Sequence, residues 1–391
     1  MSDFIVFVFL FAAVVIGWLL GHWSAGRKQR SDLVNQTSNQ PYITGLNFLL
    51  NDQPDGAIDA FIAALEVNSE TIETHLAIGN LSRRRGETDR AIRVHQNLLA
   101  RPSLSRVQRQ KVQFELALDY TKAGWLDRAE RILKELVTQG PSDNRAKVLA
   151  TLIDIYQQEQ EWGQALPLAQ EYMSFTGTEE SQKMAVAASH YCCELAQIAL
   201  NEQRFHDAEK SLRQALQLSA TNARASILKA QAQLGLGRER KALSSLKKMA
   251  DIAPDKLIEA IPLLEQILIS RGSKTDVIEF LSEFASQDES GALASVLFGQ
   301  IRKHKGDEQA LDYLNSSRKG QTTLAELLQV LEIETAKPNG VNAESLKKIA
   351  ELLLAKEQAR WNYRCRQCGF GGNQLHWLCP GCKSWGTVSR D

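Results

Sequence analysis

Apolar residues follow two different patterns along this chain. Between Phe4 and Trp23 there is no Asp, Glu, Lys or Arg, and the stretch is dense in Phe, Val, Ile and Leu. From residue 43 onward apolar residues are interleaved with polar ones, and the strand signal is negligible. The pattern therefore predicts one uniformly apolar helix followed by a long body that is almost entirely helical.

The apolar stretch predicts a membrane anchor over residues 1–23. A helix of this length spans about 30 Å, which is the thickness of the hydrocarbon core of a bilayer. Arg27, Lys28 and Arg30 follow it, and the positive-inside rule then keeps the body of the protein on the cytoplasmic side. Residues 24–42 therefore form a basic flank and a mostly polar tether.

Two other interpretations of the apolar stretch fit less well. A cleaved signal peptide would carry positive charge before the apolar run, but the only charged side chain there is Asp3. A buried core helix would have a polar face, which this run lacks. We therefore expect an uncleaved, single-pass anchor.

The body contains two columns of mostly small residues. The first column recurs at nearly regular intervals, with one longer step before Ala208, and comprises Ala57, Ala91, Ala129, Ala165, Ala208, Ala242, Val277 and Ala310. The second column precedes the first by a constant interval and comprises Gly45, Gly79, Ala117, Ile153, Ala196, Ala230, Glu265 and Phe298. Two antiparallel helices can approach closely where both columns are small. Glycine between them, as at Gly86, Gly124, Gly237 and Gly306, ends the first helix by adopting a left-handed conformation.

This pattern resembles the tetratricopeptide repeat, a helix–turn–helix unit of about 34 residues. The resemblance covers residues 43–355 and is weaker around Val277 and Ala310. The longer step before Ala208 predicts an insertion near residues 174–184. Because each helix pair must stack on its neighbours to bury its apolar stripe, we expect a superhelix with an extended concave face of the kind that binds peptides and proteins.

Four of the six cysteines form two Cys-x-x-Cys pairs near the C-terminus, in the segment 356–391. The pairs are Cys365 with Cys368 and Cys379 with Cys382. Four thiolates can close a tetrahedral shell around one metal ion, which leaves no open position for a substrate. Zinc and iron both accept this shell, so the spacing predicts one metal ion without choosing between them. His376 lies between the pairs and is expected outside the ligand set.

The two knuckles resemble those of rubredoxin, although the segment that links them is much shorter and closer to that of a zinc ribbon. This resemblance implies iron, with zinc as the alternative. Trp361, Trp377 and Trp385 gather in the same tail, and we expect some of them to pack on the last helix pair, around residues 346–354. The expected fold class is thus all-α: a tetratricopeptide-repeat superhelix with an N-terminal transmembrane helix and a small four-cysteine rubredoxin-like domain.

Charge and motifs exclude several function classes. Lys+Arg and Asp+Glu are both 46, so nothing pulls the whole chain toward nucleic acid. There is no phosphate-binding Gly-rich loop, no His-Glu-x-x-His and no Gly-x-Ser-x-Gly, and the histidines of the repeats show no ligand spacing. Cys192 and Cys193 are expected to be buried hydrophobes, and the run Arg83–Arg85 a solvated helix end. No enzyme class is indicated.

The whole order of parts resembles the lipopolysaccharide assembly protein B family of Gram-negative bacteria. The features that match are the Phe4–Trp23 stretch, the alanine columns, and Cys365, Cys368, Cys379 and Cys382. The resemblance implies a bacterial inner-membrane protein with its bulk in the cytoplasm, acting as an adaptor that regulates lipopolysaccharide biosynthesis. It implies the membrane AAA protease, the lipid A deacetylase and other lipopolysaccharide assembly proteins as partners, and it leaves a homodimer open. The alternative function is rubredoxin-type electron transfer on a repeat scaffold.

Overall fold

The computed structural model describes residues 72–139, 144–270, 276–288, 291–317, 323–336, 343–358 and 361–390, together with seven residues before Ile72. The contacts divide the chain into two units, Met1–Ile155 and Tyr156–Asp391. The predicted tether and all of the predicted anchor except Trp18 lie outside the described residues. Within the described part of the chain, no helix has both the length and the apolar character needed to cross a membrane.

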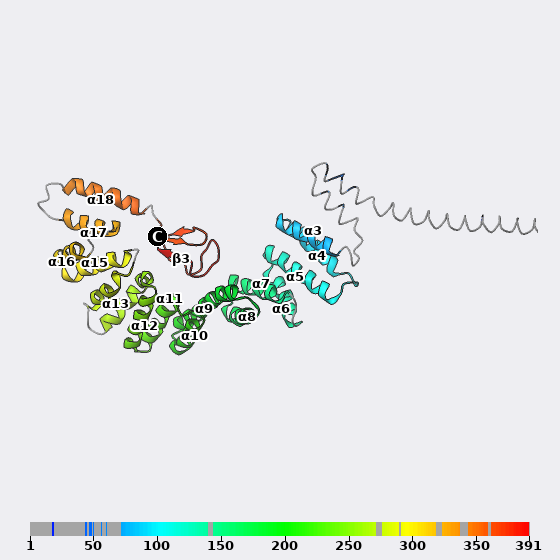
Figure 1. Cartoon of the computed structure of the whole chain (residues 1–391), viewed down its shortest axis with the longest axis horizontal. Coiled ribbons are helices and arrows are strands. Elements are labelled where there is room, and N and C mark those ends of the chain that lie inside the picture. The colour runs from blue at the N-terminus through cyan, green and yellow to red at the C-terminus, as the bar shows by residue number, and fades with distance from the viewer. Residues whose placement is uncertain are drawn as a thin grey trace, which may run out of the picture. The chain divides into compact units, whose positions relative to one another are not determined.

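The described part of the first unit is helical, as expected. Its helices are α3 (Ile72–Arg84), α4 (Thr88–Leu99), α5 (Arg106–Lys122), α6 (Leu126–Thr138) and most of α7 (Arg145–Gln158), whose end belongs to the second unit. Consecutive helices α3 to α6 pack on one another, and Figure 1 shows α3 and α4 as a blue pair followed by α5 and α6.

The second unit continues the helices and ends in short strands (Figure 1). Its helices are α8 (Trp162–Phe175), α9 (Thr178–Asn201), α10 (Phe205–Leu218), α11 (Ala223–Gly235), α12 (Glu239–Ile252), the 3₁₀ helix η1 (Pro254–Ala260), α13 (Ile261–Ser270), α14 (Asp276–Ala285), α15 (Ala292–Lys305), α16 (Asp307–Ser317), α17 (Leu324–Thr335) and α18 (Ala343–Gln358). Its strands are β1 (Tyr363–Cys365), β2 (Gly371–Gly372) and β3 (Val388–Arg390).

The two small-residue columns lie where paired helices cross. Every described member of the alanine column is buried, and Ala91, Ala129, Ala208 and Ala242 have no exposed surface. At Gly79 a Cβ atom would lie 2.3 Å from Nε2 of His95, so α3 and α4 approach too closely for any side chain at that position. Residues in the two columns are thus small because paired helices approach closely where they cross.

Five turns inside the helix pairs share one hydrogen-bond pattern. In each, the residue after a left-handed residue donates its backbone N–H to the carbonyl five residues earlier; the bonds are Glu87→Ser82, Trp125→Tyr120, Glu161→Tyr156, Arg204→Ala199 and Arg238→Gln233. This is the Schellman ending of a helix. Gly86, Gly124 and Gly237 take the left-handed position, as predicted, and Gln160 and Gln203 take it in two other turns. The prediction is wrong for Gly306, whose φ of 99° and ψ of 170° lie outside the left-handed helical region.

The additional residues that lengthen the step before Ala208 lie in a helix and not in a loop. α8 ends at Phe175 and α9 begins at Thr178, so only two residues separate them. α9 has 24 residues, against 13 in the corresponding helix α11. The predicted insertion therefore adds turns to the start of α9.

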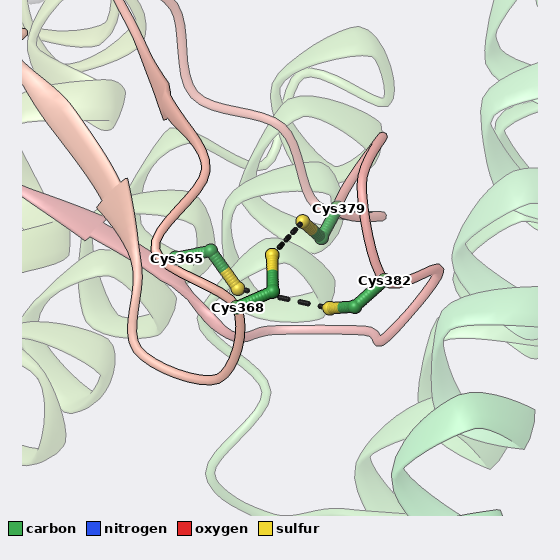
Figure 2. Close-up of side chains that lie close together, drawn as sticks. All are labelled: Cys365, Cys368, Cys379 and Cys382. Carbon is green, nitrogen blue, oxygen red and sulfur yellow. Dashed lines mark hydrogen bonds between the residues drawn. The ribbon is translucent and has the colours of Figure 1, made fainter.

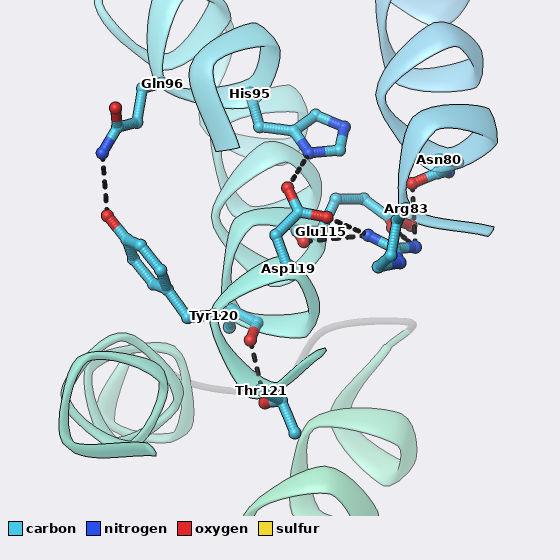
Figure 3. Close-up of polar contacts among 9 residues, drawn as sticks. Asn80, Arg83, His95, Gln96, Glu115, Asp119, Tyr120 and Thr121 are labelled. Carbon is cyan, nitrogen blue, oxygen red and sulfur yellow. Dashed lines mark hydrogen bonds and ion pairs between the residues drawn. The ribbon is translucent and has the colours of Figure 1, made fainter. Parts of the chain in front are cut away.

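The first unit contains a buried ion network that links three helices (Figure 3). Asp119 of α5 is fully buried. Its Oδ1 atom accepts a hydrogen bond of 2.7 Å from Arg83, and its Oδ2 atom lies 2.5 Å from Nδ1 of His95. Arg83 also pairs with Glu115 at 2.6 Å and donates to Oδ1 of Asn80. The expectation of a solvated Arg83–Arg85 run is wrong for Arg83, which points inward to satisfy buried carboxylates.

Candidate metal centre

The C-terminal module is a small sheet that carries two metal knuckles. Its strand order is β2-β1-β3, and β1 is antiparallel to both neighbours, with Tyr363 opposite Gly372 on one side and Arg390 on the other. Beside the sheet, Leu378 and Trp385 form an isolated antiparallel bridge, and Gly386 donates to the carbonyl of Trp377 at 2.8 Å. This hairpin encloses the second cysteine pair.

The two knuckles have the same backbone geometry. Cys365 donates its N–H to the carbonyl of Phe370, and Cys379 donates to that of Ser384, in both cases five residues ahead. The residue four places after each of these cysteines returns a hydrogen bond to its carbonyl and has a left-handed backbone: Gly369 with φ 76° and Lys383 with φ 57°. Gly369 thus takes the left-handed position of the first knuckle, and a lysine takes the same position in the second.

All four predicted cysteines are brought together (Figure 2). Their sulfur atoms lie within 4.8 Å of one another, with 3.8 Å between Cys365 and Cys382 and 3.6 Å between Cys368 and Cys379. A tetrahedral ion with sulfur bonds of about 2.3 Å has sulfur–sulfur edges of about 3.8 Å. The donor set and its spacing thus fit one closed four-thiolate metal site, and the described residues offer no other such cluster.

The electrostatics of the four thiols are unequal. Hydrogen bonding by the Thr387 hydroxyl, aided by backbone N–H groups, lowers the pKa of Cys365 to about 6. The Ser384 hydroxyl and backbone lower the pKa of Cys382. At Cys368 the backbone N–H of Phe370 acts to lower the pKa, but partial desolvation of the sulfur and hydrogen bonds with the neighbouring thiols outweigh it and raise the pKa to about 11. Four close sulfurs cannot all ionise on their own, so a bound cation would supply the missing stabilisation.

The two cysteines of each pair differ in solvent exposure. Cys365 and Cys379, the first member of each pair, are buried, with exposed fractions of 2% and 0%. Cys382 is intermediate and Cys368 is exposed. His376 packs edge-on against Phe370 and is not part of the sulfur cluster, as expected. The metal site therefore meets solvent on the Cys368 side.

The module docks on the repeats through Trp385. Its indole ring stacks on His190 at 4.8 Å between ring centroids and meets Trp162 and Tyr191 edge-on. The indole N–H donates a hydrogen bond of 2.8 Å to Oε1 of Gln157. These partners belong to α7, α8 and α9, in the middle of the repeat array.

The expectation that the module packs around residues 346–354 is wrong. Ile349, Leu352 and Leu354 of α18 remain 41–64% exposed, and Trp361 is 55% exposed. α7, α8 and α9 together offer a polar acceptor and flat rings to the indole, whereas residues 346–354 of α18 contain no aromatic ring.

A second set of contacts joins the module to η1. The hydroxyl of Tyr363 donates to the Glu259 carboxylate, and Lys256 donates to the carbonyl of Val388 at 3.2 Å. Burial and the bond to Glu259 raise the pKa of Tyr363 to about 12. Trp377 adds apolar contact with the core of the second unit. The module is thus tied to the helical scaffold at η1 as well as at α7, α8 and α9.

His190 is the buried titratable group of the docking site. Burial, with a smaller contribution from the charge of Arg224, lowers its pKa to about 3. Arg224 itself pairs with Glu194 at 2.6 Å. The imidazole is therefore neutral at physiological pH and serves as a flat surface for Trp385. Sequence spacing could not distinguish this histidine from the others in the repeats.

Cys192 and Cys193 follow His190 and Tyr191 on α9. Both are fully buried, and burial raises the pKa of each thiol to about 12. They are unreactive packing residues, which confirms their predicted role as buried hydrophobes.

Comparison with known proteins decides the family. Family models match residues 363–389 as a rubredoxin metal binding domain and residues 74–106 and 199–267 as tetratricopeptide repeats. Lipopolysaccharide assembly protein B of Escherichia coli K12 is 31% identical over 386 residues, covering 98% of this chain and 97% of the relative. The chain belongs to the lipopolysaccharide assembly protein B family. The family member from Haemophilus influenzae is 30% identical over 397 residues, with coverages of 98% and 97%.

Solved tetratricopeptide structures are also similar to parts of this lipopolysaccharide assembly protein B family member. YrrB, described as a tetratricopeptide protein with an unusual peptide-binding site, is 20% identical and covers 51% of this chain and 95% of its own, with a TM-score of 0.34. The TPR2AB domain of yeast Sti1 is 14% identical and covers 69% of this chain and 98% of its own, with a TM-score of 0.32.

Proposed function

We propose that this protein regulates lipopolysaccharide biosynthesis as a non-enzymatic adaptor tethered to the bacterial inner membrane. The observation that carries the proposal is the full-length relationship to lipopolysaccharide assembly protein B. Its architecture agrees with an adaptor, because tetratricopeptide arrays bind other proteins and the closed four-cysteine site leaves no position for a substrate.

The membrane anchor keeps the adaptor close to other proteins of the same membrane. The Phe4–Trp23 stretch and the basic residues that follow it would hold the repeats on the cytoplasmic face of the membrane. Confinement to the membrane raises the effective concentration of the adaptor near other membrane proteins. Weak contacts made by the repeats and the module are then sufficient for function.

The partners in this proposal are the membrane AAA protease and the lipid A deacetylase. The adaptor holds the deacetylase for degradation and so limits the commitment of precursor to lipid A. Other lipopolysaccharide assembly proteins bind the same scaffold, and a homodimer would present two copies of each surface. Nucleic acid is not a partner, since the net charge is zero.

The test is co-purification from membranes combined with the half-life of the deacetylase. We expect the intact chain to recover the protease and the deacetylase and to shorten the half-life of the deacetylase. A variant that lacks residues 1–23 and a Cys365→Ser variant should each lose part of this effect. The matched control is Cys192→Ala, which leaves the metal site unchanged. Unchanged deacetylase half-life and lipopolysaccharide level when the whole protein is absent would contradict the adaptor function.

The alternative is one-electron transfer by the module. It is favoured by the match to a rubredoxin metal binding domain and by the solvent-facing Cys368. It requires bound iron whose thiolate-to-iron absorption bleaches on reduction and returns on reoxidation. A colourless protein with one zinc ion per chain rejects it.

A further inference from the structure

The four-cysteine site and the docking contact are parts of one short hairpin. Cys379 donates its N–H to the carbonyl of Ser384, and the bridge between Leu378 and Trp385 closes the loop around the second cysteine pair. Trp385 follows Cys382 by three residues and carries the ring contacts to α8 and α9. A change in the positions of the four sulfur atoms would therefore shift the backbone of Trp385, which is only a few residues away.

The sulfur shell has one open side. Metal binding holds all four sulfurs as thiolates, so their reactivity toward small oxidants depends on access more than on individual pKa values. Cys368 is exposed, whereas Cys365 and Cys379 are buried. The sulfur of Cys368 lies 3.6 Å from that of Cys379, close enough for the two to form a bond after a small side-chain movement.

We propose that Cys368 is an oxidation site through which hydrogen peroxide releases the module from the repeats. The Cys368 thiolate attacks peroxide, the O–O bond breaks, and the products are a sulfenic acid and hydroxide. The Cys379 thiolate then attacks the sulfenic sulfur, which forms the disulfide and expels a second hydroxide. The two thiolates lose two electrons in total, and peroxide gains both.

The disulfide removes two of the four metal ligands. Cys365 and Cys382 alone cannot close a tetrahedral shell, so the ion dissociates. The hairpin then loses its main constraint, and Trp385 leaves the rings of Trp162, His190 and Tyr191. The result is an aromatic surface on the repeats that is covered in the reduced protein and open in the oxidised one. This inference goes beyond the proposed function and does not depend on it.

The experiment uses the purified full-length protein loaded with its metal ion. Peroxide is added in steps, and three quantities are followed together: disulfides mapped by peptide mass spectrometry, ion release into a chromogenic chelator, and hydrogen exchange of α9. We expect the Cys368–Cys379 disulfide, ion release and loss of protection in α9 to advance together. Cys368 should react about tenfold or more faster than Cys192 or Cys193, which are buried.

Two variants separate this mechanism from general damage. Cys192→Ala combined with Cys193→Ala removes the other thiols and should leave the course of the oxidation unchanged. Trp385→Ala should show the exchange pattern of the released state before any peroxide is added. Dithiothreitol with added metal ion should restore protection in the oxidised wild-type protein. First oxidation at another cysteine, or a module that stays docked after the disulfide forms, would overturn the proposal.

Discussion

The indole N–H of Trp385 donates a hydrogen bond of 2.8 Å to Oε1 of Gln157, a residue 228 positions earlier in the chain. The same oxygen accepts from the hydroxyl of Tyr191 at 3.1 Å. Gln157 therefore satisfies two polar groups at a contact that is otherwise aromatic. The pair ties the C-terminal module to the middle of the repeat array, at a point that apolar pattern alone does not reveal.

Removing the indole should undock the module. Trp385→Ala deletes a side chain of a residue that is only 9% exposed, and we expect a loss of about 3 kcal/mol or more in the stability of the docked state. Gln157→Leu should cost about 1–3 kcal/mol, because it leaves the indole N–H buried without an acceptor. Hydrogen exchange of β1 and α9 measures both effects. Trp125→Ala, at a 42% exposed position of the first unit, is the control and should leave both protected.

Removing the metal ion should unfold the module and spare the helices. The module has little apolar core beyond Cys365, Cys379 and Val388, so its fold depends on the closed sulfur shell. We expect a strong chelator to abolish exchange protection in β1 and β3 while the far-ultraviolet circular dichroism of the helices changes little. Persistent protection of β3 in metal-free protein would contradict this view.

The second unit should lose stability on acidification because of His190. Its pKa is about 3 in the folded protein and about 6.5 when unfolded, so the unfolded state binds more protons between these values. Stability is therefore complete above about pH 6.5 and falls as pH drops toward 3, by about 2 kcal/mol at pH 5. Denaturant titrations between pH 7.5 and 5 measure this slope.

His190→Phe is the matched variant for the pH dependence. Phenylalanine keeps a flat ring against Trp385 but binds no proton, so most of the slope between pH 6.5 and 5 should disappear. The exposed His206 provides the control, and His206→Gln should retain the wild-type slope. An unchanged slope in His190→Phe would show that groups other than His190 cause the pH dependence.

Glycine should stabilise the two turns that lack it. Gln160 and Gln203 have φ values of 60° and 58°, a left-handed conformation that costs a residue with a Cβ atom free energy. We expect Gln160→Gly and Gln203→Gly each to raise the free energy of unfolding by about 0.5–1 kcal/mol. Gln214→Gly, within α10, is the control and should lower it by about 1 kcal/mol. Thermal or denaturant unfolding distinguishes the signs.

Breaking the buried ion network should destabilise the first unit strongly. Asp119→Asn removes the charge that faces Arg83 and the acceptor that His95 contacts, and we expect a loss of about 3–5 kcal/mol. The exposed pair of Lys111 and Glu73 offers a comparison at 2.7 Å. Glu73→Gln should cost about 1 kcal/mol or less, since solvent screens that pair. Equal effects of the two substitutions on unfolding would contradict the importance of burial.

Features set by local spacing could be predicted from the sequence. The alanine columns specify helix pairs because a buried crossing excludes larger side chains, and Gly79 beside His95 shows how strict that exclusion is. The two Cys-x-x-Cys pairs specify a sulfur cluster because each knuckle forms within five residues. These patterns required no knowledge of distant contacts.

Features that depend on distant partners could not be predicted. The docking site of Trp385 requires the rings of α8 and α9 to converge with Gln157 of α7, and the apolar residues of α18 gave an equally plausible surface in the sequence. Arg83 looked like a solvated helix end because its carboxylate partners, Glu115 and Asp119, lie on a different helix pair. Gln160 and Gln203 carry no compositional sign of a left-handed backbone.

The docked module changes how cooperative the repeats should be. In a simple repeat array each unit contacts only its neighbours, so unfolding can begin at any point and spread as in a linear chain of coupled sites. The contacts of Trp385 with Gln157 and of Lys256 with Val388 close two loops within the second unit. Opening a helix pair inside these loops also strains the module. The helices from α8 to η1 should therefore unfold in one cooperative transition, and the stability of that transition should depend on the metal site.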